Sequence, residues 1–424
     1  MTNLNKFSTL FFLFLFIFFA HFFSKVSYIT DSRWTLQTSW ALIHHHNFVL
    51  DDFKPAIERN KYYAIEERNG HLYYTFPPGT PILCAPFLSV LEKFAKHVYY
   101  FDILNLLQSS NQGGMEVFLA SLFVALAAVF LVLVLLQWQI DSWIIWLSVF
   151  AFAFGTSAWS VASRGLFAHG PSMLFLIAGV WCLNNAVKNK EWLWLAGFIF
   201  GFAYIIRPTN SIPLFFLGLY IITIYRMQSW RFIFSSGLLL FLFFIYNHSI
   251  YGYFLSPYFS PSHIGKMHHL LGGLAGNFFS PSRGLLVYSP FLILLIPLLI
   301  LAIKQNAISR LQYILIIIIF LHSLLVSSFD YWYAGWCFGP RFFADMMPFM
   351  VILFAVSLQA YISRASALRR KFIISTAVFL CLISCWINYQ GANNAKTFEW
   401  NYLPNNIDEN RARVWDWNDI QFLR

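Results

Sequence analysis

Long apolar runs separated by short polar segments extend along most of the chain. About eleven of these runs approach the ~20 residues that a helix needs to cross the hydrocarbon of a bilayer. They lie at 7–26, 115–136, 143–160, 169–187, 192–206, 211–225, 232–250, 285–303, 311–328, 347–363 and 372–388. The pattern predicts an all-α polytopic membrane protein, with about eleven transmembrane helices in a single domain that spans residues 1–424.

The polar segments between these runs predict the orientation. If the N-terminus is cytoplasmic, the inner segments are "QWQIDS", "KNKE", "YRMQSWR", "KQNAISR" and "SRASALRRK", and four of the five carry at least two basic residues. Basic residues concentrate in cytoplasmic loops. We therefore expect residue 189 to lie inside and residues 60, 265 and 410 to lie outside.

Two outer segments are long: a first loop at 27–114 and a C-terminal tail at 389–424. Within the loop, "YYTFPPGTPILCAPFLSVLEKF" contains an apolar stretch too short to span, which favours an interfacial helix. The run at 7–23 resembles a signal peptide, but no A-x-A-like site follows it, so we interpret it as an uncleaved first helix. Because the inner loops are short, the chemistry is expected on the outer face.

Composition agrees with a membrane protein and excludes a soluble one. Of the 424 residues, 59% are hydrophobic and 11% are charged. Soluble domains average roughly 45–50% apolar residues and about 25% charged residues. The net charge of +10 would suggest nucleic acid as a partner of a soluble protein. Here the orienting basic loops and contacts with anionic membrane lipids account for it, and no nucleic-acid motif is present.

Five arginines recur at the predicted outer helix ends, in similar settings beside glycine, proline or aromatic residues: Arg33, Arg164, Arg207, Arg283 and Arg341. Each of them alone is explained as well by a side chain that reaches toward the lipid headgroups. Together they favour a cationic outer cavity, suited to a phosphate because guanidinium binds phosphate with two parallel hydrogen bonds.

Four carboxylates accompany these arginines on the outer side. Asp31, directly after the first helix, is the leading functional candidate, and the alternatives are a salt bridge to Arg33 or a solvated helix end. Asp51 and Asp52 are better explained as solvated or structural acids. Asp345 follows Arg341 by four residues, the spacing of an ordinary helical ion pair.

Histidines and cysteines provide no predicted metal site. Adjacent histidines at 44–46 point in different directions on a helix, so they cannot share one ion there. His169 is a candidate for contacting a polar substrate, with a capping or packed histidine as the alternative. The five cysteines lack zinc-site spacing, and a disulfide between Cys84 and Cys337, both expected in loops, is disfavoured.

The order of several motifs resembles the GT-C superfamily of polyprenyl-phosphate-sugar-dependent glycosyltransferases. An acid just past the first helix precedes "NGHLYYTFPPGTPILCAPF", "AHGPSMLFL" and "RPTNSIPLF". The later stretches "NFFSPSRGLLVYSPF", "YAGWCFGPRFFADMMPF" and "VWDWNDIQFLR" look like a bacterial mannosyltransferase-like subgroup. The similarity covers nearly the whole chain, and the order and spacing of its short motifs carry it.

This resemblance implies an inverting glycosyltransferase in the bacterial cytoplasmic membrane, with its active site on the periplasmic face. Asp31 would match the family's general base, although the family often has Asp-Glu where this chain has Asp31-Ser32. Some relatives bind a divalent metal, but the sparse acids here argue against one, so no cofactor is expected. The partners would be a polyprenyl-phosphate-linked sugar and a glycan, lipid or protein acceptor.

Under this interpretation, Arg164, Arg207, Arg283 and Arg341 contact the donor phosphate, whereas Arg33, His169, Tyr73, Tyr74 and Trp336 contact the rest of the substrate. Interfacial belts also explain membrane Tyr and Trp. Two other functions remain open: a glycolipid flippase or transporter, and a non-catalytic membrane scaffold of an envelope glycan pathway. A transporter is expected to show repeats and broken helices near the midplane.

Overall fold

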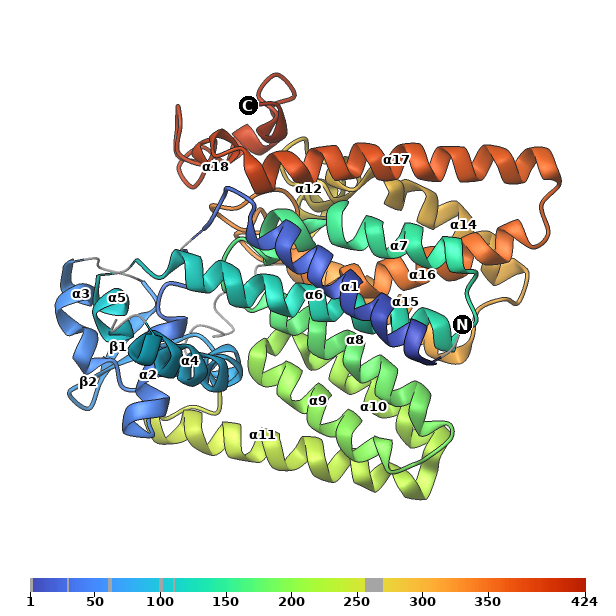
Figure 1. Ribbon diagram of the computed structural model, residues 1–424. Coiled ribbons are helices and arrows are strands. Elements are labelled where there is room, and N and C mark those ends of the chain that lie inside the picture. The colour runs from blue at the N-terminus through green and yellow to red at the C-terminus, as the bar shows by residue number, and fades with distance from the viewer. Residues whose placement is uncertain (1–2, 29, 60–62, 99–101, 110, 256–269) are drawn as a thin grey trace.

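The structure is a computed structural model that describes the chain except residues 1–2, 29, 60–62, 99–101, 110 and 256–269. The expected outer positions 60 and 265 fall outside the described residues. The fold is mostly helical, with one two-stranded sheet in the described part of the chain. The long helices run in roughly one direction, and the segments around α2 to α5 gather at one end of them (Figure 1).

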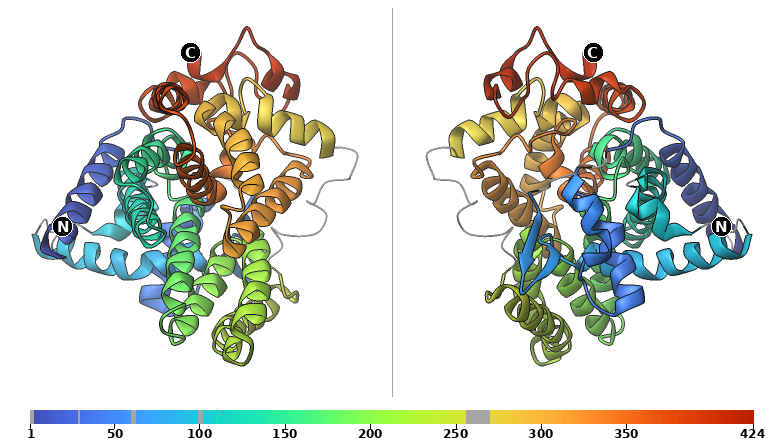
Figure 2. Two further views of the ribbon diagram at one scale, coloured as in Figure 1. Left: turned by 90° about the vertical axis from the view of Figure 1, so that its right-hand side faces the viewer. Right: turned by 90° about the vertical axis from the view of Figure 1, so that its left-hand side faces the viewer.

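A helix overlaps each of the eleven predicted ranges. The helices are α1 (Asn3–Phe22), α6 (Gly113–Gln137), α7 (Ser142–Phe154), α8 (His169–Ala186), α9 (Trp192–Ile206), α10 (Ser211–Tyr225), α11 (Trp230–Tyr251), α14 (Leu295–Lys304), α15 (Arg310–Ser327), α16 (Met347–Ile362) and α17 (Ala367–Asn393). Helix α9 packs against α8 and α11, α6 packs against α1 and α8, and α14 packs against α16. Figure 2 shows this bundle along its length from both ends.

Several of these helices are suited to a membrane. Among the described residues, five helical stretches are long and apolar enough to cross one: Gly113–Gln137, Pro208–Tyr251, Arg310–Ser327, Arg341–Ile362 and Ala367–Asn393. The other apolar helices are shorter, such as Ser142–Phe154 and Trp192–Ile206. The helical fold is therefore confirmed, and these helices are consistent with a membrane protein, whereas the count of eleven crossings and the GT-C-like bundle stay predictions.

Two predicted helices are interrupted at identifiable residues. The range 285–303 divides into α13 (Leu285–Tyr288), a 3-10 turn (Pro290–Leu294) and α14, because a proline disfavours helical geometry in the residue before it and donates no N–H. The Ser289 hydroxyl instead donates to the Gly155 carbonyl, at 2.9 Å. Gly155 itself ends α7, and a π turn (Ala158–Ala162) follows.

The outer loop at 27–114 folds into a cap that was only partly predicted. It contains α2 (Thr35–His45), a 3-10 turn (Asp51–Phe53), α3 (Lys54–Arg59), β1 (Ile65–Arg68), β2 (His71–Tyr74), α4 (Gly79–Val98) and α5 (Ile103–Gln108). The antiparallel hairpin has Asn69 and Gly70 at its turn, both with positive φ. Asn-Gly is the strongest short signal for such a hairpin, so the sequence contained the information.

Helix α4 confirms the helix expected after the Pro-Pro-Gly break and extends over 20 residues. Its start lies close to the end of α9, where a Cβ on Gly79 would collide with the backbone of Ile205 and Ile206. Glycine is therefore required for this approach, which brings the cap next to Arg207. A further helix, α12 (Leu270–Phe279), lies between the predicted helices at 232–250 and 285–303.

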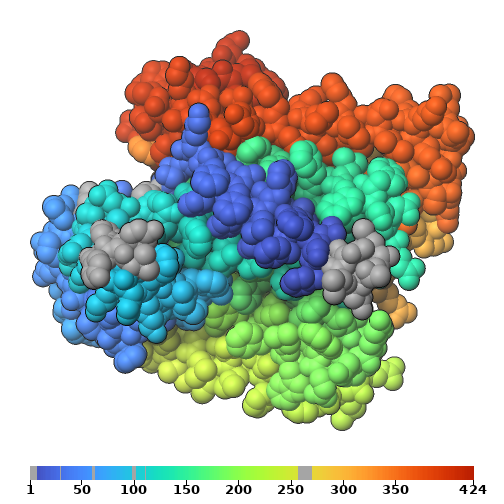
Figure 3. All heavy atoms as spheres, in the orientation of Figure 1, coloured from blue at the N-terminus to red at the C-terminus, as the bar shows by residue number. Residues whose placement is uncertain are grey.

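The C-terminal tail folds back over the end of α17, as a separate layer in the views of Figures 1 and 2. It contains α18 (Lys396–Glu399) and two 3-10 turns, Arg411–Trp415 and Gln421–Leu423. The Arg413 guanidinium donates to the carbonyl oxygens of Asn405 and Leu403, at 2.9 and 2.7 Å. In the space-filling view of Figure 3, the tail covers one side of the molecule and α1 lies on its surface.

All five cysteines are free thiols. Cys84 lies inside α4 instead of in a loop, and its side chain is buried, as is that of Cys337. The short apolar segment after the Pro-Pro-Gly break continues as a full helix, which is why the loop assignment of Cys84 was wrong.

Candidate active site

Asp31 lies in a turn whose backbone is anchored to the body of the protein. After α1, the Tyr28 N–H donates to the Arg164 carbonyl at 2.6 Å. The two segments approach so closely that a Cβ on Gly165 would collide with the Tyr28 carbonyl oxygen. The turn then closes through the Arg33 N–H, which donates to the Thr30 carbonyl at 3.1 Å, immediately before α2. Asp31 is therefore held in a defined place between α1 and α2.

The Asp31 carboxylate is largely buried, with 17% of the side chain exposed, and it has two partners. It forms an ion pair with Arg341 and accepts a hydrogen bond from the Tyr63 hydroxyl at 3.0 Å. The Tyr74 hydroxyl meets the Asp31 backbone carbonyl. Tyr63 and Tyr74 belong to the hairpin region, so the outer cap covers the acid that the sequence singled out.

Arg341 connects Asp31 to a second buried carboxylate. The Arg341 Nε–H donates to His169 Nε2 at 3.3 Å, and His169 Nδ1 lies 3.1 Å from Asp345 Oδ1. Arg207 Nη1 also contacts both ring nitrogens of His169, so guanidinium groups, which only donate, approach the imidazole at Nδ1 as well as at Nε2. Arg207 Nη1 completes the array, 2.8 Å from Asp345 Oδ2. We call Asp31, Arg341, His169, Asp345 and Arg207 the buried cluster.

The charges of the buried cluster balance. Its two guanidinium groups face two carboxylates, and its imidazole, which both guanidinium groups approach as donors, adds no charge when it is neutral. The sequence predicted an excess of positive charge at this place, but the ion pairs neutralise both arginines. The arginines also pack on rings, Arg341 at 4.8 Å from the Phe167 centroid and Arg207 at 5.9 Å from that of Phe342.

Asp345 pairs with Arg207 and His169, whereas the spacing favoured an ion pair with Arg341. The physical reason is local geometry. Residues Arg341–Met346 form a 3-10 turn, in which side chains three residues apart eclipse and the α-helical i,i+4 spacing no longer applies.

Arg164 and Arg283 lie outside the buried cluster and are saturated with neutral acceptors. The five N–H donors of Arg283 meet the carbonyl oxygens of Ser282, Tyr333 and Gly335 and the side-chain oxygens of Asn401 and Gln421. Arg164 is held by the carbonyl oxygens of His21, Ser24 and Val26 and by the Ser163 hydroxyl. Binding of a phosphate to either would require these bonds to break, and their assignment stays a prediction.

The other predicted contact residues, Arg33, Tyr73 and Trp336, do not belong to the buried cluster. Among the described residues, no hydrogen bond or ion pair of the Arg33 guanidinium is present. Tyr73 lies on β2 and packs edge-on against Tyr251 at 6.4 Å; partial burial and the Asp51 carboxylate raise the pKa of Tyr73. The Trp336 indole donates to Asn406 Oδ1 at 3.0 Å, so Trp336 belongs to the contact with the tail.

The acids and histidines of the cap pair separately from the buried cluster. His44 meets Glu92 and His45 meets Asp52, each at 2.9 Å, so these adjacent histidines point to different partners. Asp51 accepts from His71 and from the Leu72 N–H, at 2.7 and 3.0 Å. Partial burial would raise the pKa of Asp51, but these hydrogen bonds outweigh it and hold that pKa below its usual range.

Three residues near the site were not predicted: Tyr63, Glu116 and His322. His322 is buried in α15 and lies 2.9 Å from the Phe342 carbonyl oxygen. Ionisable residues inside an apolar run are functional candidates by default, and that rule identifies His322 and also Glu116, in the first turn of α6. Nothing in the sequence distinguishes Tyr63 from its neighbours.

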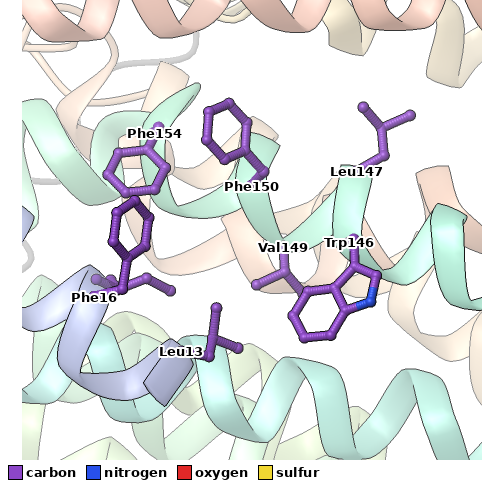
Figure 4. A pocket seen from close by; sticks show the side chains of 8 residues that line it. Leu13, Phe16, Trp146, Leu147, Val149, Phe150 and Phe154 are labelled. Atoms are coloured by element: carbon purple, nitrogen blue, oxygen red, sulfur yellow. The ribbon is translucent and has the colours of Figure 1, made fainter. Parts of the chain in front are cut away.

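Two apolar grooves indent the helices. Figure 4 shows the larger one, about 410 Å³, between Leu13 and Phe16 of α1 and Trp146 and Phe154 of α7; none of its lining residues belongs to the buried cluster. The second, about 330 Å³, lies between α12 and α15 and is lined by Phe278 among others.

The second groove lies near the turn that contains Arg341. The Phe278 ring, which lines the groove, packs 5.4 Å from that of Phe343, which follows Arg341 by two residues. His322, on α15, lies 2.9 Å from the carbonyl oxygen of Phe342 in the same turn. None of the residues that line the groove belongs to the buried cluster.

No protein-family model, curated protein or solved structure matches the chain. Membership of the GT-C superfamily therefore stays a proposal, based on the short motifs alone.

Proposed function

We propose that this protein is an inverting glycosyltransferase that moves a sugar from a polyprenyl-phosphate donor to an acceptor hydroxyl on the outer face of a bacterial cytoplasmic membrane. The single observation that carries the proposal is the ion pair between Asp31 and Arg341, inside a cluster that also contains His169 and Arg207. It places a carboxylate able to accept a proton beside cations able to bind a phosphate.

In this reaction, Asp31 accepts the proton of the acceptor hydroxyl as its oxygen attacks the anomeric carbon. The bond between that carbon and the phosphate oxygen breaks on the opposite face, and its electron pair leaves with the polyprenyl phosphate. Arg341 and Arg207 stabilise the charge on the leaving phosphate. Asp345 and His169 hold these two guanidinium groups at fixed positions in the absence of donor.

The groove between α12 and α15 supports a lipid-linked donor. Its lining is largely apolar, from Leu274 and Phe278 to Ile319 and Phe320, and Phe278 packs against Phe343 in the turn that begins at Arg341. A prenyl chain lying there would have its phosphate end near the buried cluster. A soluble sugar nucleotide would gain nothing from such a surface.

The experiment is sugar transfer by the purified protein, with a panel of polyprenyl-phosphate-linked hexoses and pentoses as donors. Asp31→Asn keeps the size of the side chain but removes proton acceptance, and general-base catalysis contributes typically 10²–10⁴-fold. We expect turnover to fall by about that factor while donor affinity stays close to wild type.

Asp52→Asn is the matched control, because Asp52 lies in the same outer loop but pairs with His45 at the surface. Near-wild-type turnover in Asp31→Asn would refute the assignment of the base. Transport of the intact glycolipid across vesicles without transfer would instead support the flippase, and neither activity would support a scaffold.

A further inference from the structure

Glu116 is a fully buried acid that the proposed reaction does not use. It lies in the first turn of α6, the most apolar of the membrane-length helices, and its side chain is inaccessible to solvent. A buried ionisable group is costly unless hydrogen bonds compensate it. An aliphatic side chain would fill the position without that cost, so the bonds that Glu116 makes indicate why an acid stands there.

A single oxygen of Glu116 joins two segments of the site. Oε2 accepts a hydrogen bond from the Ser32 hydroxyl and a second from the Leu166 N–H, at 2.5 and 3.2 Å. Ser32 directly follows Asp31. Leu166 stands three residues before His169, in the segment that leads into α8. Glu116 is therefore hydrogen-bonded to the two segments of the chain that carry the base and the imidazole of the buried cluster.

The surroundings show that this junction is built from several contacts. One turn earlier, the Gln112 side chain donates to the Arg33 carbonyl at 2.8 Å. The start of α6 thus fixes both Ser32 and Arg33, the two residues after Asp31.

We infer that Glu116 is a positioning residue, which holds the Asp31 turn and the His169 segment at the separation that the transfer needs. This inference rests on the proposed function. Glu116 does not act on substrate itself, because its carboxyl group is buried beneath Ser32. A misplacement of about 1 Å in an active site costs about 10²-fold in rate, so the loss of this junction should appear in turnover.

The first test is kinetic. Glu116→Ala is expected to lower kcat by about 10- to 100-fold while donor KM changes by less than about twofold, because no group that binds donor is removed. Glu116→Gln retains an oxygen that accepts both hydrogen bonds and is expected to recover most of the turnover. Ser121→Ala is the control on the same helix, since Ser121 is also buried but its hydroxyl has no hydrogen-bond partner.

The second test needs no activity and separates this inference from the proposed function. Hydrogen–deuterium exchange of the protein in nanodiscs should rise in Glu116→Ala at residues 31–34 and at 163–168 together, and should stay at the wild-type level in Glu116→Gln and Ser121→Ala. If Glu116→Ala fails to fold, Ser32→Ala removes one of the two bonds and is expected to raise exchange at 31–34.

Exchange that rises in only one segment of Glu116→Ala, or in neither, would overturn the inference, as would wild-type kcat in that variant. A Glu116→Gln variant as slow as Glu116→Ala would also overturn the inference, because the charge of Glu116, and not its two hydrogen bonds to Ser32 and Leu166, would then be what turnover requires. If the wild-type protein transfers no sugar, the proposed function fails. A joint rise in hydrogen–deuterium exchange at residues 31–34 and 163–168 of Glu116→Ala then decides by itself whether Glu116 joins the two segments.

Discussion

Replacing Asp345 by asparagine tests the electrostatic account of the buried cluster without any assumption about substrate. The Asp345 side chain is fully buried, and its carboxylate faces Arg207 at 2.8 Å and His169 at 3.1 Å. Asparagine has nearly the same shape, and its Oδ1 can face His169 Nδ1 as the carboxylate oxygen does. The substitution therefore removes the charge that compensates Arg207 and little else.

The expected loss is large for a single isosteric substitution. Removing one partner of a buried ion pair destabilises a protein by about 3–5 kcal/mol, because the other charge stays buried and uncompensated. Coulomb's law gives a similar value, about 4 kcal/mol for unit charges ~4 Å apart at an effective dielectric constant near 20. We expect the free energy of unfolding of Asp345→Asn to fall by that amount.

Equilibrium unfolding in detergent, followed by tryptophan fluorescence, measures this loss. Glu191→Gln is the control, because its partner Arg231 lies at a similar distance, 2.9 Å, but 61% of the Glu191 side chain is exposed. An exposed pair contributes about 0–1 kcal/mol. The double variant Asp345→Asn/Arg207→Gln should recover part of the loss, since no unpaired charge remains. A loss in Asp345→Asn no larger than in the control would refute the reasoning.

Three further predictions concern donor binding, topology and pH. Arg207→Ala and Arg341→Ala should each weaken binding of a polyprenyl phosphate by roughly 10- to 150-fold, because each variant loses a hydrogen bond of about 1.5–3 kcal/mol to a charged group. Unchanged affinity in both variants would show that these arginines do not bind the phosphate. In a cysteine-free background, a cysteine at residue 410 should react with an impermeant reagent from outside and one at residue 189 should not, and the reverse pattern would invert the orientation. The pKa of Asp51 is lowered in the folded state, so the stability that Asp51 contributes is complete above the usual aspartate pKa of about 3.9 and disappears as the pH falls through the lowered value. Hydrogen–deuterium exchange at residues 71–74 should therefore rise below about pH 4. The Asp51→Asn variant should not show that pH dependence.

The pattern along the sequence determined where the helices lie, because apolar runs of membrane length have few other stable conformations. It also identified Asp31, Arg341, Arg207 and His169 as candidates, since charged and polar residues at the ends of apolar helices are costly and conspicuous. The Asn-Gly turn of the hairpin was equally visible in the sequence. These features depend on residues close together in the chain, which is why they can be found without a structure.

Only the tertiary structure decided which of these residues meet. Asp31 and Arg341 form their ion pair across more than 300 positions of sequence, and Asp345 pairs with Arg207 and His169 although Arg341 stands closer in the chain. Five arginines looked equivalent in sequence, yet Arg164 and Arg283 are enclosed by neutral oxygens and Arg207 and Arg341 by carboxylates. Local pattern cannot distinguish them, because the electrostatic surroundings of a buried charge are set by packing between helices distant in the chain.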